Sequence, residues 1–245
     1  MRVLGLDTAT SATAVGLLEL DRDGSELTAI ERRDDPPPRS RPRHTTALLA
    51  LAIATLHDAG VGWDDLDLLA VGTGPGTFTG LRIGITTARA LAHARELPLV
   101  GVSTLRSLAK AAAVAAQAQD RLALAVLDAR RREVFAAGWA DPGAARTPLI
   151  EPAAMAPERL AATLSDSGER WLAVGDGAVG FRDVLQGSGA VVPDDGAALH
   201  RVSALEHCRL AAGLEPQNPN DVRPEYLRLP DAELTLQAGA ARAKT

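Results

Sequence analysis

The sequence GTGPGTFTGLRIG, residues 72–84, joins a predicted strand to a predicted helix and is rich in glycine. The apolar run from Leu66 to Val71 precedes it and is typical of a buried strand, and the pattern from Leu81 to Ala94 predicts a helix. Glycine tolerates positive φ angles and close approach of another backbone or a ligand. The free N–H groups of a helix start favour an anion, and the hydroxyl of Thr77 or Thr79 is a candidate N-cap.

Two interpretations of this glycine-rich stretch stay open from spacing alone. One is a phosphate-binding turn that includes Gly74 and Gly76, and the other is a tight turn that lets helix and strand pack closely. A Walker A loop needs Lys followed by Ser or Thr after its last glycine, whereas Leu81 and Arg82 follow Gly80 here. The dinucleotide-binding fingerprint is not matched either.

Composition indicates a globular protein without a disulfide framework. The 245 residues suffice for one large domain or two small ones, with 46% hydrophobic and 23% charged residues. The net charge of -5 is unlike that of most proteins that hold RNA by themselves. Cys208 is the single cysteine, which argues against a cysteine zinc site. Neither a membrane-spanning run nor a signal peptide is expected, so a cytoplasmic location is predicted.

The chain opens with three predicted strands, at residues 3–6, 13–20 and 27–31, which form an antiparallel meander. Asp7 stands at the tip of the first strand beside Thr8 and Thr10. Such a group can hold a metal-bound phosphate, or it can cap a turn. Asp7, Thr8 and Thr10, with Gly74 and Gly76, are therefore a candidate nucleotide or turn site.

A Pro-rich loop leads to a predicted helix from His44 to about Ala59. Residues 48, 51, 52, 55 and 56 form one apolar stripe at helical spacing, and Leu49 and Ile53 belong to a second. A helix with two apolar faces is buried on both sides or binds a partner. The core of a monomer offers a place for one face only.

The rest of the sequence alternates predicted strands and helices, which is typical of an α/β fold. A second lobe is expected from near Leu105. Strands are predicted at 98–102, 122–127, 134–139 and 171–174, and helices at 104–117, 157–164 and 204–212. The segment after about residue 229 is expected to be a disordered tail.

Four motifs in this order resemble the TsaB (YeaZ) family. They are LDTAT at 6–10, the glycine-rich stretch at 72–84, LDARRREVF at 127–135 and PEYLR at 224–228. The glycine-rich stretch is the most specific of them. The resemblance implies an actin-like ATPase (ASKHA, RNase H-like) fold with two related lobes, at residues 1–104 and 105–228.

The resemblance also implies a function. Proteins of this family are non-catalytic subunits in the synthesis of N6-threonylcarbamoyl-adenosine next to the anticodon of tRNAs that read codons beginning with A. The implied partner is the transferase TsaD, bound through the helix pair of the first lobe, and a TsaE-type ATPase and the tRNA join through the complex. The interface residues expected on that helix pair are His44, Leu48, Leu49, Ile53, Gly80, Arg82, Gly84, Thr87 and Leu91.

Catalytic and metal-binding residues are not expected in this chain. The catalytic relative binds its metal through His-x-x-x-His, which places both rings on one helix face. His44 is present here, but the matching position is Leu48. His57 lies roughly 20 Å from His44 at 1.5 Å per residue. No cofactor is expected on the chain alone, and ATP or ADP at the interface of the complex is left open.

Two other functions remain as alternatives. A stand-alone actin-like ATPase or kinase would bind a nucleotide with Asp7 and the turn at 175–177. A homodimeric scaffold would pack the same helix pair on a second copy. Direct contact with tRNA through the arginines at 130–132 also stays open, although such a run is more often a solvated turn.

Overall fold

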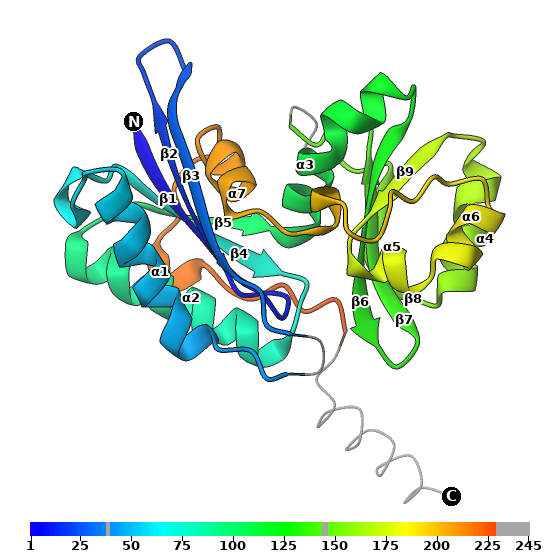
Figure 1. Cartoon of the computed structure of the whole chain (residues 1–245), viewed down its shortest axis with the longest axis horizontal. Helices are drawn as coiled ribbons and strands as arrows, with labels where there is room; N and C mark the ends of the chain where they lie inside the picture. The colour runs from blue at the N-terminus through cyan, green and yellow to red at the C-terminus, as the bar shows by residue number, and fades with distance from the viewer. Residues whose placement is uncertain (38–39, 144–146, 229–245) are drawn as a thin grey trace, which may run out of the picture.

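The computed structural model describes residues 1–37, 40–143 and 147–228, and Figure 1 shows two lobes, each built on one mixed β-sheet. The predicted tail at 229–245 lies outside the described residues. Each sheet begins with an antiparallel three-strand meander and adds a parallel strand after a helix. This repeated topology agrees with the two related lobes that the resemblance implies.

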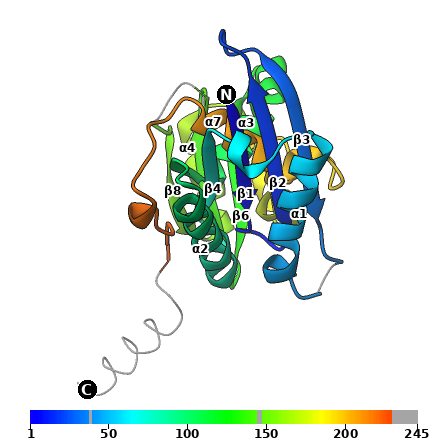
Figure 2. The ribbon, with the colours of Figure 1, turned by 90° about the vertical axis from the view of Figure 1, so that its left-hand side faces the viewer.

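The sheet of the first lobe has the order β3-β2-β1-β4-β5. Its strands are β1 (Arg2–Asp7), β2 (Thr13–Leu20), β3 (Glu26–Asp34), β4 (Leu68–Gly74) and β5 (Leu99–Ser103). Strands β1, β2 and β4 are buried almost without interruption. Because successive residues of a strand face opposite sides, both faces of the sheet need cover there. Helices α1 (His44–Asp58) and α2 (Phe78–Arg95) cover one face and lie side by side in Figure 2.

Helix α7 (Ala204–Ala211) covers the opposite face of the first sheet. Cys208 and Ala211 pack there against Val3 and Leu18, so Cys208 is a buried residue of this core. The division predicted from the sequence assigned 105–228 to the second lobe, whereas this helix packs on the first. Figure 1 shows the reason: the chain returns from the second lobe before α7 begins.

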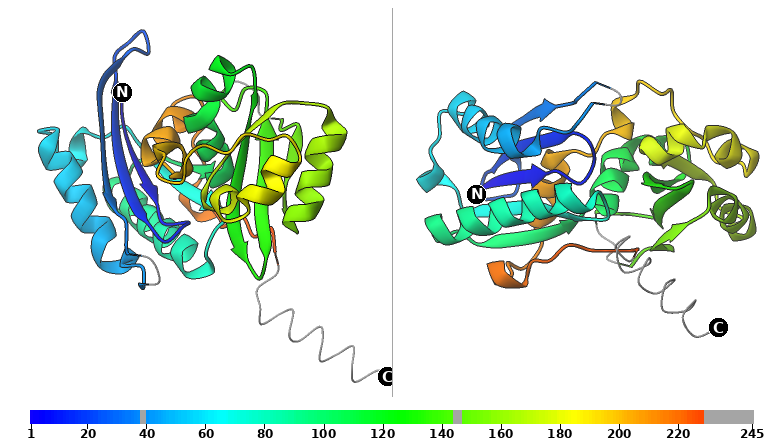
Figure 3. Two further views of the ribbon diagram at one scale, coloured as in Figure 1. Left: turned by 45° about the vertical axis from the view of Figure 1, so that its right-hand side comes forward. Right: turned by 90° about the horizontal axis from the view of Figure 1, so that it is seen from below.

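The sheet of the second lobe has the order β8-β7-β6-β9. Helix α3 covers one face, and α4, α5 and α6 lie on the other. The elements are α3 (Thr104–Ala118), β6 (Leu122–Arg130), β7 (Glu133–Trp139), β8 (Ile150–Met155), α4 (Pro157–Ser167), β9 (Trp171–Val174), α5 (Asp176–Gly180) and α6 (Arg182–Gly187). Short 3-10 turns are η1 (Trp63–Asp65), η2 (Ala198–His200) and η3 (Pro219–Asp221). Figure 3 shows α3 and α7 between the two sheets.

The glycine-rich stretch differs from its prediction in two respects. Strand β4 continues through Gly74, and α2 begins at Phe78 rather than at Leu81. Thr77 occupies the N-cap position, but its side chain makes no capping hydrogen bond. The turn between strand and helix is therefore reduced to residues 75–77. The predicted series of elements also missed β8, α5 and α6, because their short segments have little periodicity.

Candidate functional site: the outer face of the first lobe and the Asp7 turn

The outer face of α1 carries two exposed aliphatic side chains. Leu49 is 45% and Ile53 is 58% exposed, whereas Leu48, Ala52 and Leu56 are buried against the first sheet. This confirms the two apolar stripes predicted for the helix. One stripe belongs to the core, and the other faces outward in the free chain.

The residues predicted for the partner interface fall into three groups. Leu49, Ile53 and Arg82 are exposed, and Thr87 and Leu91 are half-buried. The remaining four residues are buried within the chain: His44, Leu48, Gly80 and Gly84. For these four the assignment to a partner surface is corrected, because their neighbours belong to the monomer itself.

Gly80 and Gly84 make room for the loop that follows β1. A Cβ at Gly80 would lie 2.0 Å from the carbonyl oxygen of Thr8, and one at Gly84 would lie 2.3 Å from the Thr8 Oγ1. The Thr8 hydroxyl donates a hydrogen bond of 2.7 Å to the Gly80 carbonyl oxygen. The two glycines were expected at the partner interface; they accommodate this loop instead.

His44 is held inside the first lobe. Its Nδ1 lies 2.9 Å from the Thr13 hydroxyl oxygen, and its Nε2 has no hydrogen-bond partner among the described residues. Burial lowers the pKa of His44, and the Asp7 carboxylate opposes this shift in part. The ring is therefore favoured in its neutral form at the start of α1.

Asp7 is 1% exposed, and both of its carboxylate oxygens contact groups of the chain. Oδ1 accepts the Ala9 N–H at 3.0 Å, and Oδ2 lies 2.8 Å from His207 Nε2 on α7. The Thr104 hydroxyl also donates to Oδ2, at 3.5 Å. These contacts join the end of β1 to α7 and α3. They are the contacts expected of a carboxylate that stabilises a turn.

The other residues of the candidate nucleotide or turn site lie around Asp7 and are also engaged internally. The Thr10 hydroxyl accepts the Ala12 N–H at 3.3 Å, and the Gly74 N–H donates to the Thr104 hydroxyl at 3.2 Å. A Cβ at Gly76 would lie 2.4 Å from the Ala9 carbonyl oxygen. The structure thus brings this predicted group together, with Gly76 packed closely against the loop.

The turn at 175–177 in the second lobe is packed in a similar way. The Gly175 N–H donates to His200 Nδ1 at 3.1 Å, and Asp176 Oδ1 accepts the Asp128 N–H at 2.9 Å. Burial raises the pKa of Asp176. A Cβ at Gly175 would lie 2.1 Å from the Val126 carbonyl oxygen, so strand β6 fills the space beside this turn.

The arginine run forms the tip of the β6–β7 hairpin. Arg130, Arg131 and Arg132 have φ angles of 64°, 55° and 61°, a left-handed conformation that is costly for residues other than glycine. Arg130 forms an ion pair with Asp128 at 3.0 Å. The prediction of a solvated turn agrees with the exposure of all three arginines.

Sequence reasoning missed an aromatic stack at the start of α2. The rings of Phe78 and Tyr226 are stacked with centroids 5.4 Å apart, and the Arg82 guanidinium lies 3.8 Å from the Phe78 centroid. Phe78 lies in the motif at 72–84 and Tyr226 in the motif at 224–228. Neither motif contains a signal that two side chains 148 positions apart are in contact. Sequence reasoning also missed His207, because a single histidine on a predicted helix carries no signal of its partner.

In residues 1–37, 40–143 and 147–228 no three His, Cys, Asp or Glu side chains are grouped so that they could hold a metal ion. Across that same part of the chain, no helix combines the length and apolar character needed to cross a membrane.

Comparison with known proteins shows the family. The family model described as tRNA N6-adenosine threonylcarbamoyltransferase (TsaD) matches residues 36–220. The tRNA threonylcarbamoyladenosine biosynthesis protein TsaB of Escherichia coli is 34% identical over 198 residues, which are 79% of each protein. TsaB of Haemophilus influenzae is 34% identical over 55% of this chain and 52% of its own length.

Solved structures agree with this result. An uncharacterized protein from Pseudomonas aeruginosa, described as similar to the peptidase YEAZ, superposes with a TM-score of 0.73 at 29% identity over 93% of this chain and 99% of its own. YeaZ from the same organism superposes with a TM-score of 0.71 at 26% identity, over 92% and 100%. The α/β fold with two lobes that was expected from the sequence is confirmed, and the chain belongs to the TsaB (YeaZ) family of tRNA threonylcarbamoyladenosine biosynthesis proteins.

Proposed function

We propose that this chain is a non-catalytic subunit that forms a heterodimer with a TsaD homologue and activates it as a threonylcarbamoyltransferase. The observation that carries the proposal is the exposed aliphatic pair on α1, Leu49 and Ile53. Burial of large aliphatic side chains stabilises an association by about 1.5–3 kcal/mol for each fully covered residue. A TsaE-type ATPase and the tRNA are then reached through the complex.

The neighbouring helix extends this apolar face. Ile83 and Leu91 of α2 are half-buried and pack against the same core as α1. Ala90 of the same helix is exposed, so α2 also presents a small residue to solvent. Two adjacent helices with aliphatic and small residues suit packing against a second helix pair. A partner that shares the fold can supply such a pair.

The internal contacts of Asp7 support an accessory role for the free chain. Both carboxylate oxygens contact protein groups, and Leu48 stands where the catalytic relative has its second histidine. A nucleotide at the interface of the complex stays a prediction.

Co-elution of the purified chain with its TsaD homologue in size-exclusion chromatography tests the proposal. The wild-type chain is expected to co-elute, and the variant Leu49→Asp/Ile53→Asp is expected to lose association at least tenfold. Both side chains are already exposed, so the double variant should keep the stability of the monomer, as measured by urea unfolding.

Leu27→Asp is the matched control, since Leu27 is 61% exposed on β3, away from α1. It should co-elute like the wild type. Failure of the wild-type chain to bind, or equal binding by all three proteins, would contradict the proposal. A homodimer of the wild-type chain that the double variant abolishes, without any complex with TsaD, would favour the homodimeric scaffold instead.

A further inference from the structure

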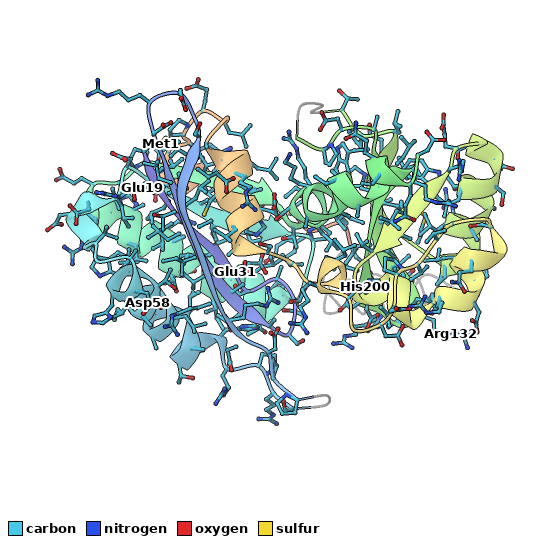
Figure 4. The ribbon with its side chains drawn as sticks, turned by 45° about the horizontal axis from the view of Figure 1, so that its top comes forward. Met1, Glu19, Glu31, Asp58, Arg132 and His200 are labelled. Atoms are coloured by element: carbon cyan, nitrogen blue, oxygen red, sulfur yellow. The ribbon has the colours of Figure 1, made fainter. Side chains whose placement is uncertain are left out.

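An open cavity of about 400 Å³ lies where α3 of the second lobe faces α7 of the first. Figure 4 shows these two helices between the lobes, with Glu31 labelled beside the start of α7. The lining includes Arg106 and Lys110 of α3, Gly143 after β7, and Arg209 and Leu210 of α7. The cavity is therefore built by both lobes.

The charged side chains of the described residues that line this cavity are all positive. Arg106 and Lys110 are four positions apart on α3, and Arg209 reaches the cavity from α7. Side chains at this spacing share one face of a helix, and like charges there repel each other. The described part of the lining contains no carboxylate that would offset the repulsion. A bound anion would offset it.

Both arginines are held in place by other contacts of the chain. Arg106 donates through Nε to the Pro142 carbonyl oxygen at 2.8 Å and through a terminal nitrogen to the Gly143 carbonyl oxygen at 3.1 Å. Arg209 forms ion pairs with two glutamates that do not line the cavity. Because the two guanidinium groups are already positioned, less conformational freedom is lost when a ligand binds between them.

Lys110 differs from the two arginines in its contacts. Its ammonium group makes no hydrogen bond or ion pair with any residue that the structure describes. The side chain is half-buried, and a Cβ at Gly143 would lie only 2.8 Å from its Nζ. An ammonium group has three donors, and a partly desolvated cation attracts an anion more strongly than one in bulk water. Lys110 can therefore give all three donors to a ligand.

A neighbouring cavity of about 550 Å³ also includes Lys110, but its lining has mixed charge. Three carboxylates line it, and one of them, Asp120, pairs with Arg170 at 3.0 Å. Carboxylates repel an anion, so this second cavity does not have the same preference. The excess of positive charge belongs to the cavity between α3 and α7.

We propose that the cavity between α3 and α7 binds a phosphate group, either inorganic or carried by a small molecule, through Lys110, Arg106 and Arg209. A phosphate group has close to two negative charges at neutral pH and at least three acceptor oxygens, so it can contact cations on two helices at once. A carboxylate offers two oxygens in one plane.

This phosphate site is separate from the groups considered for the partner surface and for a nucleotide. It uses neither α1 nor α2. Thr104, at the start of α3, contacts Asp7, and Lys110 lies about 9 Å farther along the same helix at 1.5 Å per residue.

Isothermal titration calorimetry of the full-length chain tests the site with inorganic phosphate, glycerol phosphate and acetate at one ionic strength. The wild-type chain should bind one phosphate group in a saturable manner and should not bind acetate. Tighter binding of glycerol phosphate than of inorganic phosphate would assign a phosphate ester, and the reverse order would assign inorganic phosphate. Lys110→Gln should weaken the binding at least about tenfold, because a charged contact is lost. Lys110→Arg, which keeps the charge, should retain most of it.

Arg170→Gln is the matched control, since it removes one cation from the neighbouring cavity and leaves Lys110 in place. It should bind phosphate like the wild type. Circular dichroism shows whether each variant is folded; if Lys110→Gln is not, Lys110→Met, which keeps the aliphatic chain, decides the question in the same way. The proposal is overturned if the wild type shows no saturable binding, if Lys110→Gln binds unchanged, if Arg170→Gln loses binding, or if acetate binds equally well.

Discussion

At the scale of single residues, two glycines of α2 determine how closely the helix approaches the β1–β2 loop. Gly80 faces a backbone carbonyl oxygen of Thr8, whereas Gly84 faces the end of the Thr8 side chain. A backbone atom cannot move without moving the loop, but a hydroxyl can rotate away. An added methyl group should therefore lower the free energy of unfolding by different amounts at the two positions.

We expect Gly84→Ala to lower the free energy of unfolding by about 1–3 kcal/mol, the usual cost of overpacking. Gly80→Ala should cost more, at or above about 3 kcal/mol, because its clash is with backbone. Urea unfolding of the two variants measures both. Gly180→Ala is the control, since a Cβ there meets nothing within 4 Å. Equal and small losses at 80 and 84 would contradict this account of the packing.

His44 makes stability depend on pH in a defined direction. Burial lowers the pKa of the folded protein's His44 below its ordinary value of 6.5, so the unfolded chain binds a proton that the folded chain does not. The contribution of His44 to the free energy of unfolding is fully present above about pH 6.5. As the pH falls below that value, the free energy of unfolding decreases by no more than about 1.4 kcal/mol per pH unit.

Urea unfolding at about pH 7.5 and about pH 5 checks this sign. The wild-type chain should lose more stability between the two values than His44→Gln, which lacks the titrating ring. His57→Gln, which changes an exposed histidine of the same helix, should behave like the wild type. A larger loss in His44→Gln than in the wild type would show that the sign is wrong.

At the scale of elements, α7 is held on the first sheet by contacts that cannot be predicted from its own sequence. Glu31 of β3 accepts hydrogen bonds from the Ala204 N–H at 2.6 Å and the Leu205 N–H at 3.3 Å, at the N-terminus of the helix. A carboxylate is favoured at this end of a helix dipole. The same strand also presents Glu26 to Arg209, near the other end.

These two glutamates allow a matched comparison on one strand. Glu31→Ala should lower the free energy of unfolding by about 1.5–3 kcal/mol, the range for hydrogen bonds to a charged group. Glu26→Ala breaks an ion pair in which both side chains are partly exposed, so its loss should stay below about 1 kcal/mol. Thermal or urea unfolding measures both. A Glu26 variant that loses as much as the Glu31 variant would refute the assigned role of Glu31.

At the scale of the whole molecule, local patterns predicted most elements but not the contacts between distant ones. The meander, the two-faced α1 and the strand–glycine–helix unit follow from periodicity and turn residues. The placement of α7 on the first sheet does not, because its apolar face would fit either lobe. The Asp7–His207 pair joins positions 200 apart, and a single sequence contains no signal for such a pairing.

The same limit applies to the candidate site. Leu49 and Ile53 were predicted to face outward because the core can cover only one stripe of a helix. Gly80 and Gly84 were assigned to a partner surface because small residues permit close approach, but a sequence does not say which neighbour approaches. Here the neighbour is Thr8 of the same chain, so intramolecular packing accounts for a motif that had suggested an interface.

The aromatic stack at the start of α2 gives the molecule a set of optical reporters. Tyr226 is the single tyrosine of the chain, and it contacts Phe78 of the first lobe while Arg228, two residues later, forms an ion pair with Glu133 of the second. Trp63 packs on the core of the first lobe, and Trp139 and Trp171 belong to cores of the second. The environment of Tyr226 therefore reports on the segment that spans the lobes, while the three tryptophans report on the lobes themselves.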